Sequence, residues 1–194
     1  MMFKIIDDFL SASYLKDLQN HFLTLQCEWH YNDHLTDDDS YHNIGSFGFT
    51  NKLHWNQNLV DSSCGILTKG LLLFSQAKVQ EFTQTSYQIV RARADMTMYN
   101  PSKYCHEIHT DYPYEHMTAI FYVNNSDGNT LLFDREGKHL IKEVEPIENR
   151  LLIFDGLLQH AGHSPSNHKS RVIVNMNFMT SELINELNQR YNRQ

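Results

Sequence analysis

The sequence predicts a mainly β fold, a jelly-roll barrel with flanking helices, and three features support this prediction. Helical periodicity is confined to about the first 80 residues and to the C-terminal end of the 194-residue chain. Six short apolar runs occupy the region of about 84–179, and turn-forming pairs such as Asn100-Pro101 and Asp127-Gly128 separate them. Two of these runs, 117–124 and 171–178, place different residue types on their two faces, as half-buried strands do. Helices followed by many antiparallel strands are typical of a helix-braced jelly-roll barrel.

The N-terminal part of the chain, about 1–80, is expected to be a helical support for this barrel. Residues 2–6 read as a short strand, and Ser11 is a suitable cap for a helix over about 12–26. One face of that helix carries its apolar side chains, which are Tyr14, Leu15, Leu18, Phe22 and Leu25. Residues 30–49 show no helical period and many turn formers, which predicts a long loop of the kind that often serves as a lid. A second helix is expected within 57–80.

The strands of the barrel follow in order after residue 84. They are expected in the runs SYQIVRARADMTMYN, MTAIFYVN, NTLLFD, HLIKEVEP, RLLIFDG and RVIVNMNFM. The last element is a helix over about 181–193, with an apolar stripe of Leu183, Leu187 and Tyr191. Because no repeat, low-complexity tract or Pro/Gly linker interrupts the chain, we expect 1–194 to form a single domain.

Composition and charge exclude several classes of partner. The formal net charge is −7 and there is no basic run, so nucleic acid is not expected as a partner. No apolar run approaches the length of a membrane span, and the first ten residues lack the apolar core of a signal peptide, so we expect a cytoplasmic protein without a membrane partner. Three cysteines without a C-x-x-C pair indicate reduced thiols. Histidine is unusually frequent, with 12 residues, which suggests a metal site.

His109-Thr110-Asp111 is the only H-x-D motif of the chain. If it lies in a strand, residues two apart point to the same face, so the imidazole and the carboxylate can hold one metal ion from one side. A motif this short also arises by chance, and a solvated entry to a strand is the alternative.

The C-terminal third of the chain strengthens the metal hypothesis. His160 follows an apolar strand, and Arg171 opens another strand in which Arg171, Ile173, Asn175 and Asn177 share one face. The opposite face is apolar and should pack beneath the helices, so the Arg/Asn face should line the barrel interior. A buried arginine needs a carboxylate or phosphate partner, which a ligand would supply if no protein acid does. A sheet face open to water is the alternative.

Two tyrosines can join Arg171 in this interior. Tyr122 shares a strand face with Thr118, Ile120 and Asn124, and Tyr99 ends the strand that precedes His109. Each tyrosine alone is more simply a core or rim aromatic. Two hydroxyls and one guanidinium that converge on a pocket would form a clamp for the tail of a dicarboxylate.

The ordered set Y-x-P … H-T-D … T-x-x-x-Y-V-N … D-G-N-T-x-x-F … H … R resembles the prolyl-4-hydroxylase-type dioxygenases that depend on 2-oxoglutarate and iron(II). The resemblance covers about residues 90–178 and is greatest to the short forms carried by bacteriophages and marine bacteria. It implies a double-stranded β-helix, which is a jelly-roll or cupin-like barrel. The chain departs from the family pattern in a longer segment between His160 and Arg171 and in Gly128-Asn129, where Gly-Gly is usual.

The resemblance also implies roles for individual residues. His109, Asp111 and His160 would bind Fe(II), and Arg171, Tyr99 and Tyr122 would hold the far carboxylate of 2-oxoglutarate. His163, in the loop after His160, is the other candidate for the distal ligand. Four further residues are expected to contact either the metal ligands or the substrate, namely His106, Thr118, Asn175 and Asn177.

The implied reaction is hydroxylation of an unactivated C–H bond. The cosubstrates would be 2-oxoglutarate and O2, ascorbate is a further candidate cofactor, and the substrate would be a prolyl residue of a peptide or protein. A barrel that binds a metal or another ligand without catalysis is the alternative. A zinc site formed by His30, His34 and His42 in the long loop is a weaker hypothesis. The sequence does not indicate the oligomeric state.

Overall fold

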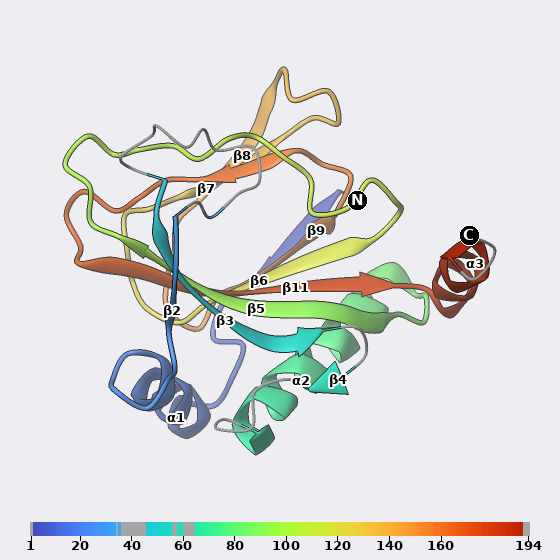
Figure 1. The fold of residues 1–194 in the computed structure, drawn as a ribbon, viewed down its shortest axis with the longest axis horizontal. Coiled ribbons are helices and arrows are strands. Elements are labelled where there is room, and N and C mark those ends of the chain that lie inside the picture. The colour runs from blue at the N-terminus through green and yellow to red at the C-terminus, as the bar shows by residue number, and fades with distance from the viewer. Residues whose placement is uncertain (1, 34, 36–45, 56–57, 60–64, 192–194) are drawn as a thin grey trace.

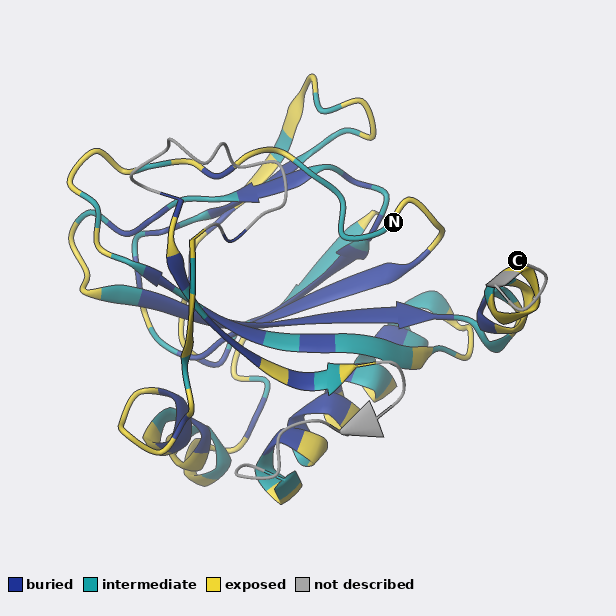
Figure 2. Ribbon diagram, in the orientation of Figure 1, coloured by how far each residue is buried: buried dark blue, intermediate teal, exposed yellow. Residues whose placement is uncertain are grey.

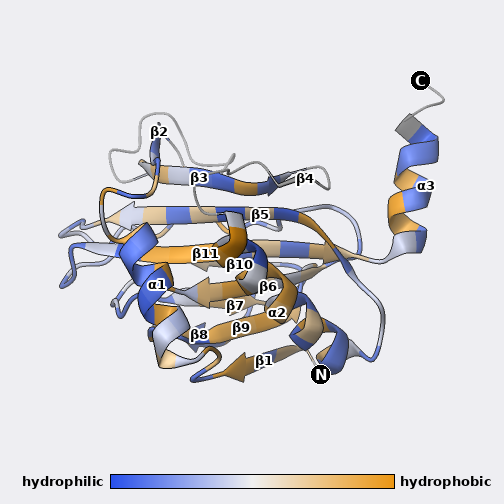
Figure 3. Cartoon of the chain, turned by 90° about the horizontal axis from the view of Figure 1, so that it is seen from below, coloured by the Kyte–Doolittle hydropathy of each residue, from blue (hydrophilic) through white to orange (hydrophobic). Residues whose placement is uncertain are grey.

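The structure, a computed structural model, describes residues 2–33, 35, 46–55, 58–59 and 65–191. Two β-sheets face each other, and two helices cover the outer face of the larger sheet (Figures 1 and 3). The helices are α1 (Ala12–Phe22), α2 (Gly65–Thr83) and α3 (Ser181–Tyr191). The strands are β1 (Phe3–Ile6), β2 (His30–Asn32), β3 (Gly48–Trp55), β4 (Asn58–Leu59), β5 (Gln88–Met98), β6 (Met117–Tyr122), β7 (Thr130–Phe133), β8 (Leu140–Val144), β9 (Leu151–Asp155), β10 (His160–Gly162) and β11 (Ser170–Met179).

The larger sheet has the strand order β1-β9-β6-β11-β5-β3-β2, with β4 paired to β3. The smaller sheet has the order β10-β7-β8. All of these pairs are antiparallel, and most neighbours in space are far apart along the chain. This arrangement is the double-stranded β-helix that the sequence predicts, and the predicted strands of the region 84–179 are confirmed as β5 to β9 and β11.

The two faces of β11 separate two hydrophobic clusters, as its alternating sequence predicts. On the helix side, Val172 and Val174 pack with Leu18 of α1 and Leu71 of α2 in one cluster. On the barrel side, Ile173 packs between the sheets with seven other buried residues, which are Ile120, Tyr122, Leu132, Val144, Leu152, Phe154 and Leu158. Strands β6, β9 and β11 are therefore buried almost throughout (Figure 2). The polar residues of β11 must face the remaining barrel interior.

The prediction that residues 1–80 form a helical support is wrong in part. Strand β1 confirms the short strand predicted at residues 2–6, but β2, β3 and β4 also come from this region. Strand β3 adds directly to β5, with Thr50 opposite Asp95. The sequence hides β3 because its residues are largely polar, including the buried Asn51, whose side chain donates to the Glu28 carbonyl oxygen at 2.9 Å. The segment 30–49, predicted to be one loop, therefore includes β2 and the beginning of β3. Most of its centre, 36–45, lies outside the described residues, as do His34 and His42 of the zinc hypothesis.

Helix α1 ends earlier than the sequence predicts. Ser11 caps it as expected, because its hydroxyl accepts from the Tyr14 amide. The helix ends at Phe22, whose carbonyl oxygen accepts from the Trp29 indole at 3.3 Å, and Leu25 beyond it is fully exposed rather than part of the apolar face.

The other two helices lie near their predicted positions. Helix α2 runs later than expected and reaches Thr83, and α3 stands away from the sheets with Ile184 as its buried residue. None of the helices in the described part of the chain has the length and apolar character that a bilayer crossing requires.

Candidate metal and cosubstrate site

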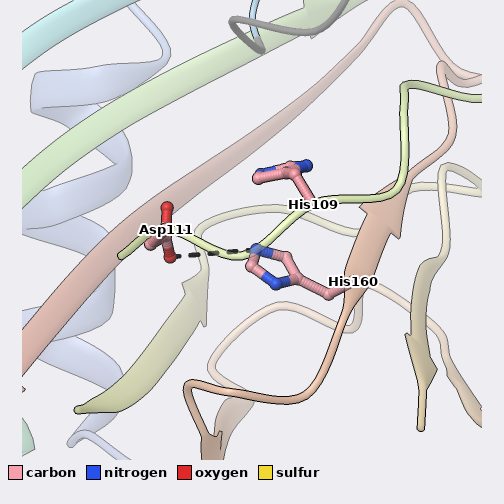
Figure 4. Close-up of side chains that lie close together, drawn as sticks. All are labelled: His109, Asp111 and His160. Carbon is pink, nitrogen blue, oxygen red and sulfur yellow. Dashed lines mark ion pairs between the residues drawn. The ribbon is translucent and has the colours of Figure 1, made fainter. Parts of the chain in front are cut away.

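The side chains of His109, Asp111 and His160 lie close together (Figure 4). One possible ligand atom from each lies within 4.8 Å of the other two. The backbones of His109 and His160 exchange two hydrogen bonds, His109 N to O at 3.0 Å and His160 N to O at 2.8 Å. The H-x-D motif does not lie in a regular strand, because His109 forms an isolated bridge with His160 and a bend follows at Asp111. That bridge joins the segment 109–111 to β10.

The surroundings of the two imidazoles favour metal binding. The Nδ1 atom of His109 lies 2.9 Å from the Glu107 carbonyl oxygen, which leaves Nε2 for another partner. His160 is buried, and desolvation lowers its pKa to about 4 despite the nearby Asp111 carboxylate. The ring of His160 is thus neutral near pH 7, the form in which imidazole binds a metal.

Asp111 is the most closely held of the three residues. Burial alone would raise the pKa of its carboxyl, but the Arg91 cation, the two imidazoles and the Asn177 amide hold that pKa well below its ordinary value. Arg91 forms an ion pair with Oδ1. Asn177 donates to Oδ2 at 2.9 Å, and Asn175 lies 3.3 Å from both oxygens. The carboxylate is therefore ionised and oriented before any ion binds.

Arg171 lies in the same cavity and is 5% exposed. Its Nη2 donates to the Thr130 hydroxyl at 2.7 Å, and the Tyr122 hydroxyl donates to the same oxygen at 2.8 Å. A side chain at Gly128 would collide with the Arg171 stem, since its Cβ would lie 2.9 Å from Cδ. Burial lowers the pKa of the guanidinium, which still remains charged near neutral pH.

Arg171 has no acidic partner of its own among the described residues of this cavity. Asp95, the described acid that lines the cavity wall, pairs instead with Arg93, with Nε and Oδ1 2.6 Å apart. The Nε of Arg171 has no hydrogen-bond partner within the described part of the chain. A buried cation in this state is costly unless an anion joins it.

The structure brings most of the other predicted residues near this site but not all. His106 is buried and lines the cavity, and Thr118 accepts from Asn177 at 3.1 Å. His163 lies outside the three-residue cluster. Tyr99 is 52% exposed and does not line the cavity.

Four further residues of the site escaped the sequence analysis. Arg91 contacts Asp111, and the others line the cavity, namely Arg93, Asp95 and Thr130. The first three share one face of β5, and Ala92 and Ala94 lie on the other. In the sequence RARAD, charged residues alternate with alanine, and this strand-like pattern was the signal for the three charged residues.

The donor set fits a divalent transition metal. Two imidazoles and one ionised carboxylate on one side of an ion leave other positions open, and this set suits iron(II). The Nε2 of His160 lies 3.8 Å from Oδ2 of Asp111, close enough for one ion to contact both.

Comparison with known proteins agrees with this geometry. Residues 94–179 match the model of the 2OG-Fe(II) oxygenase superfamily. This part of the chain is similar to that superfamily. The superfamily name specifies iron(II) and 2-oxoglutarate, and iron(II) suits the His-Asp-His cluster. No curated protein matches the chain in sequence.

Solved structures of 2OG-Fe(II) oxygenases share the fold over most of the chain. An oxidoreductase of this family from Burkholderia pseudomallei has a TM-score of 0.70 at 10% identity, covering 91% of this chain and 84% of that one. A Trichoplax adhaerens prolyl hydroxylase, in complex with a peptide of hypoxia inducible factor, has a TM-score of 0.66 at 16% identity, with 93% and 84% covered. A Pseudomonas putida prolyl-4-hydroxylase has a TM-score of 0.61 at 14% identity, with 92% of both chains covered. At these identities the likeness shows the fold alone.

Proposed function

We propose that this chain is a 2-oxoglutarate- and iron(II)-dependent oxygenase that hydroxylates a prolyl residue of a peptide or protein. His109, Asp111 and His160 hold the iron, and Arg171 holds the far carboxylate of 2-oxoglutarate. When both are bound, they supply O2 activation, in which 2-oxoglutarate becomes succinate and carbon dioxide and the substrate C–H becomes C–OH. The superfamily match supports the reaction class.

The observation that carries the proposal is the buried Arg171 beside the three ligands. The same cavity is lined by His109, His160 and Arg171, so a dicarboxylate can reach the metal with one end and the guanidinium with the other. A neutral buried partner, the Thr130 hydroxyl, positions the guanidinium without neutralising it. A planar guanidinium can hold a carboxylate through two parallel hydrogen bonds. A barrel that only stored a metal would have no need of this cation.

The remaining residues of the site orient and shield the reactants. Tyr122 is fully buried, and burial raises the pKa of its hydroxyl, which therefore stays protonated and can donate to Thr130. Ile120 and Ile173 supply apolar walls to the cavity. Such walls limit the access of water and strengthen the Arg171–carboxylate interaction.

The prolyl part of the proposal has narrower support than the reaction class. Two of the structures that share the fold are prolyl hydroxylases, and one of them holds a peptide. The same fold also serves an alpha-ketoglutarate-dependent epimerase of nogalamycin biosynthesis. The substrate therefore has to be tested directly.

The test has two stages. Anaerobic addition of iron(II) and then 2-oxoglutarate should produce a weak visible charge-transfer band, which should be absent in Asp111→Ala and need far more 2-oxoglutarate in Arg171→Ala. After admission of air, proline-containing peptides should gain the mass of one oxygen atom only when 2-oxoglutarate is present. No band from the folded parent protein would contradict the reaction class. A band and 2-oxoglutarate turnover without any prolyl product, but with another hydroxylated metabolite, would contradict the prolyl substrate alone.

A further inference from the structure

Arg91 is a partly buried cation that contacts the proposed metal ligand Asp111. It lies on β5, and its side chain is 13% exposed. Its terminal nitrogen pairs with Oδ1 of Asp111, and its Nε donates to Oδ1 of Asn177 at 2.8 Å. The guanidinium lies over the Tyr112 ring, 5.3 Å from its centroid. Three neighbours thus fix the guanidinium in position.

The two oxygens of the Asp111 carboxylate have different surroundings. Oδ1 takes the Arg91 ion pair, and Oδ2 takes the Asn177 amide and lies 3.8 Å from Nε2 of His160. Asn177 closes the arrangement because it accepts from Arg91 and donates to Asp111. The register supports this, since Arg91 and Asn177 are directly opposed across β5 and β11.

The position of a cation beside a metal site has to be explained, because the two positive charges repel each other. Repulsion between a guanidinium and a divalent ion lowers metal affinity, most of all in a buried site with a low effective dielectric. Removal of Arg91 would on charge alone improve metal binding. Arg91 offsets part of this repulsion because it keeps the buried Asp111 ionised, and its further benefit lies in how the carboxylate binds.

A carboxylate can bind a metal through one oxygen or through both. An octahedral ion held by three single-atom protein ligands would keep three positions open, enough for the two donor atoms of 2-oxoglutarate and for O2. A chelating Asp111 would occupy one of these positions. The ion pair at Oδ1 prevents this because it satisfies that oxygen with another cation.

We propose that Arg91 is a positioning residue that restricts Asp111 to binding iron through Oδ2 alone. This inference rests on the proposed function, because it concerns the same metal site. It predicts that loss of the guanidinium lets Asp111 chelate the ion through both oxygens. The ion then stays bound through a chelating carboxylate, and the cosubstrate loses one of its positions.

Manganese(II) without cosubstrate is a suitable probe of this inference. Water proton relaxation counts the exchangeable waters on the bound ion, and the parent protein should show about three. Arg91→Gln and Arg91→Met should each show about two while still binding manganese. The dissociation constant of 2-oxoglutarate, measured by titration of the manganese form, should rise about tenfold, a loss of about 1.4 kcal/mol. Arg91→Lys restores a cation beside Oδ1 and should recover most of the difference.

Arg93→Gln is the matched control for the charge. Arg93 lies two residues further along the same face of β5 and pairs with Asp95 rather than with Asp111. Its loss removes a similar cation from the barrel but leaves both contacts of Asp111 in place, so the water count should stay at the parent value. A similar fall of the water count in Arg93→Gln would attribute the effect to charge and overturn the inference.

Failure of this inference can be distinguished from failure of the proposed function. If the parent binds no manganese, the metal site itself is wrong. If it binds manganese and 2-oxoglutarate, and a folded Arg91→Gln or Arg91→Met variant keeps the parent water count and cosubstrate affinity, the function stands and the role of Arg91 is refuted. Circular dichroism and thermal unfolding of the metal-free variants identify those that remain folded.

Discussion

At the scale of single residues, the site combines groups whose protonation suits a metal before the metal arrives. Asp111 is held ionised and His160 neutral by their surroundings, so little proton release should accompany binding at neutral pH. The variants His109→Ala, Asp111→Ala and His160→Ala should therefore each lose metal binding and 2-oxoglutarate turnover while keeping the fold. His163→Ala should retain both activities, and isothermal titration with manganese(II) measures the difference. Turnover lost in His163→Ala and kept in His160→Ala would reverse the assignment of the distal ligand.

Arg171 provides the second prediction at this scale. Arg171→Ala should weaken 2-oxoglutarate binding by about 2–5 kcal/mol, because it leaves a carboxylate unpaired in a buried cavity. Arg171→Lys keeps the charge but loses the planar group that binds a carboxylate through two hydrogen bonds, so it should weaken 2-oxoglutarate binding less than Arg171→Ala does. Tyr122→Phe removes the hydroxyl bond to Thr130, which lies beside the guanidinium, and should cost about 0.5–1.5 kcal/mol. Iron(II) affinity should survive in all three variants. Unchanged 2-oxoglutarate affinity in Arg171→Ala would show that Arg171 does not bind the far carboxylate of 2-oxoglutarate.

At the scale of elements, the strands with clear alternation were predictable, and those with mixed polarity were not. β11 shows its two faces in the sequence because Val172, Val174 and Met176 pack against helices while Asn175 and Asn177 meet the metal ligand. β3 gave no such signal, since its buried residues include Asn51, whose amide donates to the Glu28 carbonyl oxygen, a neighbour that the sequence does not reveal. The contact of Arg91 with Asp111 has the same cause. It depends on pairing between β5 and a bend 20 residues later, a distance at which local patterns say nothing.

The loop between β10 and β11 carries a prediction at this scale, because Asp127 tethers it just before Arg171. The carboxylate accepts from the Ser166 and Asn167 amides, both at 3.0 Å, and from the His168 ring at 2.8 Å. Burial would raise the pKa of Asp127, but these donors outweigh it and lower that pKa. The tether therefore stabilises the fold above about pH 4, the ordinary pKa of the group, and is lost as the pH falls further.

Asp127→Ala should lower unfolding stability by about 1–2 kcal/mol and raise the 2-oxoglutarate dissociation constant a few-fold, because the start of β11 loses its support. Asp134→Ala is the matched control. Asp134 accepts from the Lys138 amide at 2.8 Å in the loop between β7 and β8, so its loss should affect stability but not cosubstrate binding. Hydrogen exchange of residues 164–170 should accelerate only in Asp127→Ala. Equal effects of both variants on 2-oxoglutarate binding would exclude a specific role of the tether.

At the scale of the whole molecule, the site joins the two sheets. His160 belongs to β10 of the smaller sheet, and Arg171 belongs to β11 of the larger one, while His109 and Asp111 lie on the segment between β5 and β6. The sequence could predict this convergence only through the order of the motif, because the strands that meet here are distant along the chain. A bound metal and cosubstrate would connect all of these elements. Ligand binding should therefore stabilise the fold as a unit and not one loop alone.

Thermal unfolding tests this coupling. A ligand at about 100 times its dissociation constant stabilises the native state by about 2.7 kcal/mol. For a chain of this size each kcal/mol raises Tm by about 2–4 °C, so saturating manganese(II) should raise it by about 5–10 °C. 2-Oxoglutarate should add a further rise only when the metal is present, because it binds the ion with one end and Arg171 with the other. Arg171→Ala should keep the metal increment and lose most of the second, whereas His109→Ala should lose both. A full 2-oxoglutarate increment in His109→Ala would show that the dicarboxylate binds without the metal, and the two ligands would then occupy independent sites.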